Sequence, residues 1–103
     1  MTGIGVDQDS PGAAMVPHRT RVEAFAADGE CLLYHPVRDE ASALNRSATE
    51  VWDLCDGRLT VAGIIGALAV RYGVGEAQLV NDVAGVLKTL RARDLIQFGQ
   101  VVE

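Results

Sequence analysis

The chain is poor in the side chains that most often carry out chemistry. It has only two cysteines and two histidines in 103 residues, and Cys31 and Cys55 are not in CxxC register. No pair among these four side chains has zinc-ligand spacing, so we expect no metal and two buried thiols. A Gly-rich phosphate loop, a GxSxG motif and an HExxH motif are also missing. We therefore expect a protein without catalytic residues or cofactor, which is not an enzyme.

Positive charge is scarce as well. Nine Lys and Arg residues stand against fourteen Asp and Glu residues, which gives a net charge of −5. Proteins that hold nucleic acid or anionic membranes do so mainly through clustered Lys and Arg. No apolar run approaches the length of a membrane span, and the acidic start of the chain does not resemble a secretory signal. We expect a cytoplasmic protein that binds neither nucleic acid nor membrane.

Apolar residues are plentiful, at 49% of the chain, which is enough for one compact core. Residues 1–17 are rich in Gly, Asp, Ser and Pro and show no periodicity. Such a composition is typical of a disordered tail. The expected organisation is therefore a tail over residues 1–17 and a single domain over residues 18–103.

The domain begins with a pattern typical of strands. Asp28-Gly29 lies between two apolar runs, as in a hairpin with a type I′ turn, where both central residues have positive φ. Pairing about this turn sets Ala26 opposite Cys31, Ala24 opposite Leu33 and Val22 opposite His35. After Pro36 a polar connection leads to a third short strand, Ala41–Asn45.

Three helices are expected after these strands. Ser47 and Glu50 have the spacing of a capping box, which predicts that a first short helix begins at Ser47 and ends at Asp56-Gly57. Thr60 is a second N-cap, followed by apolar residues at helical spacing and by Gly73 as the stop. A third helix is predicted over Glu76–Arg93, with acid early and base late.

A short extended segment, Leu95–Phe98, is expected after the last helix. The order of elements predicts an α+β fold similar to a winged helix-turn-helix. In this fold an N-terminal three-stranded antiparallel sheet is followed by three helices and the short C-terminal extended segment.

The third helix has more apolar surface than one core requires. On a helical wheel its apolar residues cover an arc about 160° wide, whereas a helix that packs on one core needs about 100°. Neighbouring helices on two sides could cover this arc, or part of it could line an open groove beside the edge strand. The opposite face is expected to meet solvent; it holds Asn81, Asp82, Gly85, Lys88, Thr89 and Arg93.

An ordered set of residues from Leu44 to Ile96 resembles the pyrroloquinoline-quinone biosynthesis protein D (PqqD) family. The residues that carry the resemblance are Leu44-Asn45, Ala48, Val51-Trp52, Asp56-Gly57, Thr60-Val61, Ile64, Leu68, Tyr72, Asp82-Val83, Leu87, Leu90 and Leu95-Ile96. The family commonly has glycine just before the final Leu-Ile, where this chain has Asp94, so the third helix could close differently here.

The resemblance implies a precursor-peptide recognition element for ribosomally made, modified peptides. Such a domain binds the precursor's leader as an added strand beside its third strand and against its third helix. A physical argument agrees, because an edge strand offers unpaired backbone groups and an adjacent apolar groove can select alternate side chains. The implied peptide-binding residues are Ala41, Ser42, Ala43, Leu44, Asn45 and Arg46 of the strand side, and Leu79, Val83, Val86, Leu87, Leu90 and Arg91 of the helix. Trp52 is instead expected in the core.

The expected function is therefore a non-catalytic adaptor. Its partners would be the leader of a precursor peptide and a separate modifying enzyme, such as a radical-SAM maturase, a peptidase or a cyclase. The alternative is a small winged-helix regulator that binds DNA or a protein partner. Arg38 and Arg46, close to the third strand, suggest contacts with acidic residues of the leader, each worth at most about 1 kcal/mol when exposed.

Overall fold

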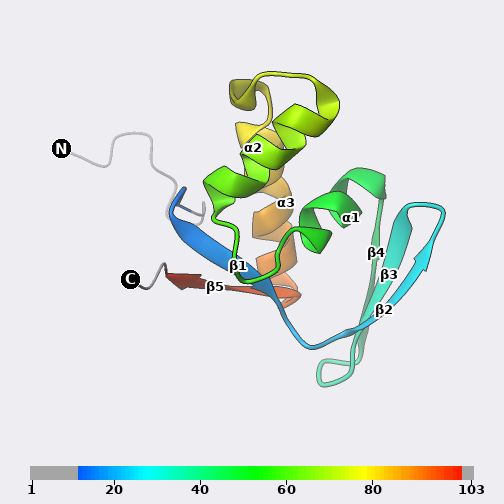
Figure 1. The fold of residues 1–103 in the computed structure, drawn as a ribbon. Helices are drawn as coiled ribbons and strands as arrows, with labels where there is room; N and C mark the ends of the chain where they lie inside the picture. Colours follow the sequence, from blue (N-terminus) through cyan, green and yellow to red (C-terminus); the bar gives the residue numbers. More distant parts are fainter. Residues whose placement is uncertain (1–11, 101–103) are drawn as a thin grey trace.

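The computed structural model of the protein describes residues 12–100. Two small sheets and three helices make up this part of the chain (Figure 1). The elements are β1 (Met15–Arg19), β2 (Glu23–Ala27), β3 (Glu30–His35), β4 (Glu40–Leu44), α1 (Arg46–Asp53), α2 (Val61–Tyr72), the short 3-10 helix η1 (Glu76–Gln78), α3 (Val80–Ala92) and β5 (Ile96–Gln100).

The three-stranded sheet confirms the expected N-terminal part of the α+β fold. Its strand order is β2-β3-β4 and both pairings are antiparallel. Ala26 pairs with Cys31 and Ala24 with Leu33, as predicted, whereas Val22 lies before β2. Asp28 and Gly29 have φ of 55° and 81°, the positive values that a type I′ turn requires. The sequence therefore sets both the turn and the register of this hairpin.

A second sheet was not predicted. β1 pairs antiparallel with β5, from Met15 opposite Gln100 to Arg19 opposite Ile96. Met15–Pro17 belong to this strand, although the disordered tail was expected to extend to residue 17; residues 1–11 of that tail lie outside the described part. Pro17 is fully buried and its carbonyl accepts a hydrogen bond from the Gly57 amide at 3.1 Å. This pairing joins the two ends of the described chain.

The first helix begins at a different cap from the one expected. Asn45 is the N-cap, with its side-chain oxygen accepting a hydrogen bond from the Ala48 amide at 2.9 Å. The predicted capping box at Ser47 is wrong, because Ser47 already lies inside α1. The helix ends at Asp53 with Leu54 as C-cap, before Gly57, so that glycine serves the following loop rather than the helix end.

This difference gives a matched pair of substitutions. Asn45→Ala should lower the free energy of unfolding by about 1 kcal/mol, since it removes the partner of a helix N-terminal amide. Ser47→Ala should change it by less than about 0.5 kcal/mol, as is usual for an exposed surface position. Urea denaturation measures both values, and an equal or larger loss for Ser47→Ala would show that Asn45 is not the cap.

The later helices follow the prediction more closely. Thr60 caps α2 by accepting a hydrogen bond from the Gly63 amide at 3.0 Å, and Gly73 closes the helix with φ of 68°. The predicted third helix is divided, because η1 occupies its first residues and α3 begins only at Val80. Its last turn also ends one residue early, at Ala92.

The core lies where α1 joins the sheet to the other two helices. Figure 1 shows α1 between β3 and β4 on one side and α3 on the other. Every layer contributes buried side chains: Leu33 from β3, Val51 and Trp52 from α1, Ile64 and Leu68 from α2, Leu87 and Leu90 from α3, and Ile96 from β5. Trp52 is thus a core residue, as expected, and the Arg19 guanidinium lies 5.3 Å from its ring centre.

The end of α3 explains the departure from the family's common glycine. Asp94 has φ of 57°, a left-handed conformation that glycine adopts without cost and that short polar side chains tolerate best among the others. No helix within residues 12–100 is long and apolar enough to cross a membrane.

Candidate functional site

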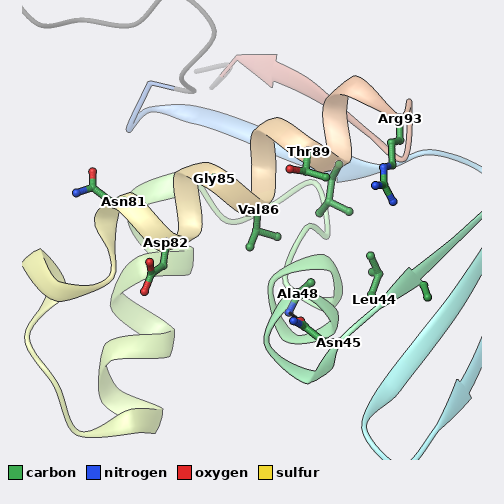
Figure 2. Close-up of a pocket in the computed structure, with 11 residues that line it drawn as sticks. Leu44, Asn45, Ala48, Asn81, Asp82, Gly85, Val86, Thr89 and Arg93 are labelled. Atoms are coloured by element: carbon green, nitrogen blue, oxygen red, sulfur yellow. Dashed lines mark hydrogen bonds between the residues drawn. The ribbon is translucent and has the colours of Figure 1, made fainter.

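A groove of about 430 Å³ lies between the end of β4, the start of α1 and one face of α3. Figure 2 shows its lining, in which side chains of α3 face those of α1 and β4. The lining residues are Ala43, Leu44, Asn45 and Ala48 on one side, and Asn81, Asp82, Gly85, Val86, Thr89, Leu90 and Arg93 of α3 on the other. Among residues 12–100, no others line this groove.

One wall of the groove ends at a free sheet edge. β4 is the last strand in the order β2-β3-β4, so it pairs only with β3 in the described structure. In an antiparallel strand alternate backbone groups face opposite neighbours, which leaves half of those in β4 without a strand partner. Ser42 and Leu44 are buried on the core side, whereas Ala41 and Ala43 are exposed. A free edge of this kind can accept another extended chain.

The floor of the groove is apolar. Leu44 and Leu90 are 6% and 1% exposed, so they form its base, while Val86 and Ala48 are half-buried along its walls. In Figure 2 the Val86 side chain points from α3 toward α1, on which Ala48 lies. An apolar side chain entering here would meet carbon atoms on several sides.

Only some of the α3 residues that were predicted to bind the peptide line the groove. Val83 and Leu87 are 2% and 0% exposed and belong to the core, and neither lines the groove. Val86 and Leu90 do line it. Core packing therefore covers most of the wide apolar arc of α3. Within this arc only Val86 and Leu90 border the groove.

The polar side of α3 is largely exposed, as expected, and it also borders the groove. Asp82, Thr89 and Arg93 line the groove together with Val86. Their spacing of i, i+4, i+7 and i+11 sets all four along one stripe of the helix. That spacing was the available signal, but a mixed stripe of acid, valine, threonine and arginine does not by itself indicate a binding face.

Several predicted site residues lie elsewhere. Ala41, Ser42 and Leu79 do not line the groove. Arg46 donates to the Asp28 carbonyl at 3.0 Å, and the Arg91 guanidinium lies 5.7 Å from the Phe98 ring centre. The structure thus brings together Ala43, Leu44, Asn45, Val86 and Leu90 of the predicted set, and adds Ala48, Asn81, Asp82, Gly85, Thr89 and Arg93.

The arginines expected to meet an acidic leader are engaged on the sheet. Arg38 forms an ion pair with Glu40 at 3.1 Å, and Arg46 is held at the β2–β3 turn. The arginine that does line the groove is Arg93.

A buried histidine ties the sheet to the end of α3. His35 Nδ1 accepts a hydrogen bond from the Arg38 amide at 3.2 Å, and its Nε2 lies 2.9 Å from Asp94 Oδ2. Since Nδ1 is an acceptor, the proton of the neutral ring is on Nε2, which donates to the carboxylate. This contact links β3 to the left-handed residue that follows the α3 C-cap and so helps to fix the spacing of the two groove walls.

Two substitutions of Asp94 distinguish the stabilising effect of its contact with His35 from the cost of its left-handed backbone conformation. Asp94→Ala should lower the free energy of unfolding by about 0.5–1 kcal/mol more than Asp94→Gly, because only alanine keeps a Cβ at positive φ. Both variants lose the contact with His35. Urea denaturation compares them, and a glycine variant less stable than the alanine variant would contradict this explanation.

The cysteines do not form a reactive site. Burial raises the pKa of the Cys55 thiol to about 12, so this thiol stays protonated near neutral pH and is a poor nucleophile or metal ligand. Cys31 is also buried. Residues 12–100 contain no group of three His, Cys, Asp or Glu side chains arranged to hold a metal ion.

Comparison with known proteins identifies similar families and folds. A family model described as Coenzyme PQQ synthesis protein D (PqqD) matches residues 30–96. Two curated relatives, both named PqqA binding protein, come from Rhodopseudomonas palustris. The relative from strain TIE-1 is 49% identical over 43 residues, and the one from strain ATCC BAA-98 / CGA009 is 44% identical over 43 residues. Each match covers 42% of this chain and 42% of the relative, so the chain spans less than half the length of these relatives.

A solved structure has the same fold. It is described as TbiB1 in Complex with the TbiA(beta) Leader Peptide, and it matches with a TM-score of 0.70 at 20% identity. The match covers 82% of this chain and 99% of that chain. None of these matches carries a DNA-binding description, so nothing in them favours a DNA-binding regulator.

Proposed function

Because the chain belongs to the PqqD family, we propose that it is a non-catalytic adaptor that binds the leader of a ribosomally made precursor peptide. The leader adds as a strand to the free edge of β4 and sets alternate side chains into the groove against α3. The adaptor then presents the peptide to a separate modifying enzyme. The relatives' name, with its reference to PqqA, and the leader peptide in the matched complex support a peptide ligand.

The observation that carries this proposal is the position of the groove beside a free strand edge. An extended chain on β4 would satisfy the unpaired backbone groups of that strand. Side chains alternate across a strand, so every second residue of the leader would point toward Leu44, Val86 and Leu90. Backbone pairing supplies affinity for any sequence, and the groove supplies selection.

Fluorescence anisotropy with a labelled leader tests the proposal. The probe is the leader segment of a PqqA peptide, the ligand given in the relatives' name, and a scrambled peptide of equal composition is the control. We expect saturable binding of the leader and at least about tenfold weaker binding of the scrambled peptide. Absence of binding by both peptides would refute the proposed function.

N-methylation of single leader amides tests the mode of binding. Strand addition places alternate amides against β4, so methylation should weaken binding at every second position and be tolerated in between. A leader bound as a helix would instead lose affinity over a continuous run of positions. The period of the effect therefore distinguishes the two modes.

A further inference from the structure

We infer that the groove selects a leader segment with opposite charges at its two ends: an acidic side chain at Arg93, a basic side chain at Asp82, and an apolar residue between them. This inference rests on the proposed function and names the class of peptide that the same site takes. It goes beyond apolar selection because it fixes the order of charges along the bound strand.

The first support is the state of the two charged side chains. Asp82 and Arg93 are exposed and both line the groove. Neither side chain makes a hydrogen bond or an ion pair with the described part of the chain. In Figure 2 both extend from the side of α3 that faces α1 and β4. They are thus available to a ligand that lies in the groove.

The second support is the order of the lining along α3. Asp82 lies in the first turn, Arg93 directly follows the last residue, and Val86 and Leu90 lie between them. The other lining residues are apolar or uncharged, so the groove has one negative end and one positive end. Arg46 and Arg91 do not disturb this pattern, since neither lines the groove.

The helix geometry sets the spacing that the peptide must match. Eleven residues at 1.5 Å per residue separate the two Cα atoms by about 16 Å along the helix axis. An extended peptide advances about 3.3 Å per residue, so about five residues cover this distance. Side chains on one face are an even number of residues apart, which gives opposite charges four or six positions apart with an apolar residue at an even position between them.

The position of β4 indicates which end is which. In Figure 2 Arg93 lies on the side where Leu44 ends the strand, and Asp82 lies on the far side of Ala48. The acidic residue of the peptide is therefore expected beside β4, and the basic residue beyond the start of α1. A peptide with the same composition and the two charges exchanged would place like charges together at both ends.

An mRNA-display selection from a library of random twelve-residue peptides tests the inference. This experiment does not require the sequence of the natural leader. The wild-type protein should enrich peptides that carry an acid and a base four or six positions apart. The double charge reversal Asp82→Lys with Arg93→Glu should enrich the opposite order. The reversals Asp53→Lys and Arg21→Glu are matched controls, because both residues are exposed and lie outside the groove; this control pair should enrich the wild-type order.

Direct titration of one enriched peptide gives the size of the effect. Each single reversal should weaken binding about fivefold, the upper range for an exposed ion pair, and exchanging the peptide charges should restore binding to the double variant. If the wild-type protein and the double variant enrich peptides with the same order of charges, or with no preferred order, the inference is overturned and strand addition is left intact. Enrichment of no peptide by any variant would overturn both this inference and the proposed function.

Discussion

Leu87→Ala should lower the free energy of unfolding by about 3 kcal/mol. Leu87 is fully buried at the centre of α3 and belongs to the core cluster, and removing such a side chain leaves a cavity that the surroundings fill only in part. Small domains are stable by about 5–15 kcal/mol, so this single change would remove a large fraction of the total. Urea denaturation of the purified protein measures it.

Val80→Ala is the matched control for this prediction. Val80 lies on the same helix but is 45% exposed, so its truncation should cost less than about 1 kcal/mol. A small effect at Leu87 would mean that this residue faces an open surface. Helical periodicity alone allows either position for Leu87, and the structure assigns it to the core.

Gly85→Leu should abolish most peptide binding while making the folded domain more stable. Gly85 is exposed inside α3, and a Cβ added there would meet no atom within 4 Å. Replacing a mid-helix glycine with a good helix former gains about 0.5–1 kcal/mol. The same side chain would project into the groove that Gly85 lines, where overpacking should weaken binding by tenfold or more, on the order of the cost of inserting a bulky group.

This opposite change in stability and binding distinguishes a blocked site from a damaged fold. Thermal unfolding should show a raised midpoint while anisotropy shows lost affinity for the leader. Ala67→Leu is the control, since Ala67 is exposed on α2 and does not line the groove. Undiminished affinity of Gly85→Leu would show that the peptide does not pass this part of α3.

Local signals predicted local structure well. The Asp28-Gly29 turn fixed the pairing of β2 with β3, and Thr60 and Gly73 correctly marked the ends of α2. The cap of α1 was missed because Asn45 and Ser47 both have suitable side chains within two residues of each other. Which of them caps depends on where β4 stops pairing with β3, and this is set by tertiary contacts.

The pairing of β1 with β5 could not be read from the sequence. β1 holds Pro17, which lacks an amide donor, and its partner lies at the other end of the described chain. β1 shows no clear alternation of apolar and polar residues, and although Leu95–Phe98 was expected to be extended, nothing in its sequence indicates its partner. Long-range pairing of two such segments is decided by the packing around them, including the hydrogen bond from Gly57 to the Pro17 carbonyl.

The groove coincides with the predicted peptide-binding residues only in part, and peptide binding there stays a prediction. The edge strand and the use of α3 follow from the family resemblance and from the excess apolar arc. The rotation of α3 about its axis does not, because contacts with α1 and the core decide which stripe faces the groove. Asp82, Thr89 and Arg93 are exposed, as expected, and only the placement of the neighbouring elements shows that they border the groove.

The measurement that tests strand addition most directly is a map of backbone amide chemical shifts. Isotope-labelled protein is titrated with the leader segment of a PqqA peptide, and shifts are assigned residue by residue. The largest changes should fall on residues 41–45 and 48 and on residues 82–93, with contacts between peptide and β4 amides in the bound state. Changes confined to the Asp28-Gly29 turn or to α2, with residues 41–45 and 82–93 unmoved, would contradict this binding site.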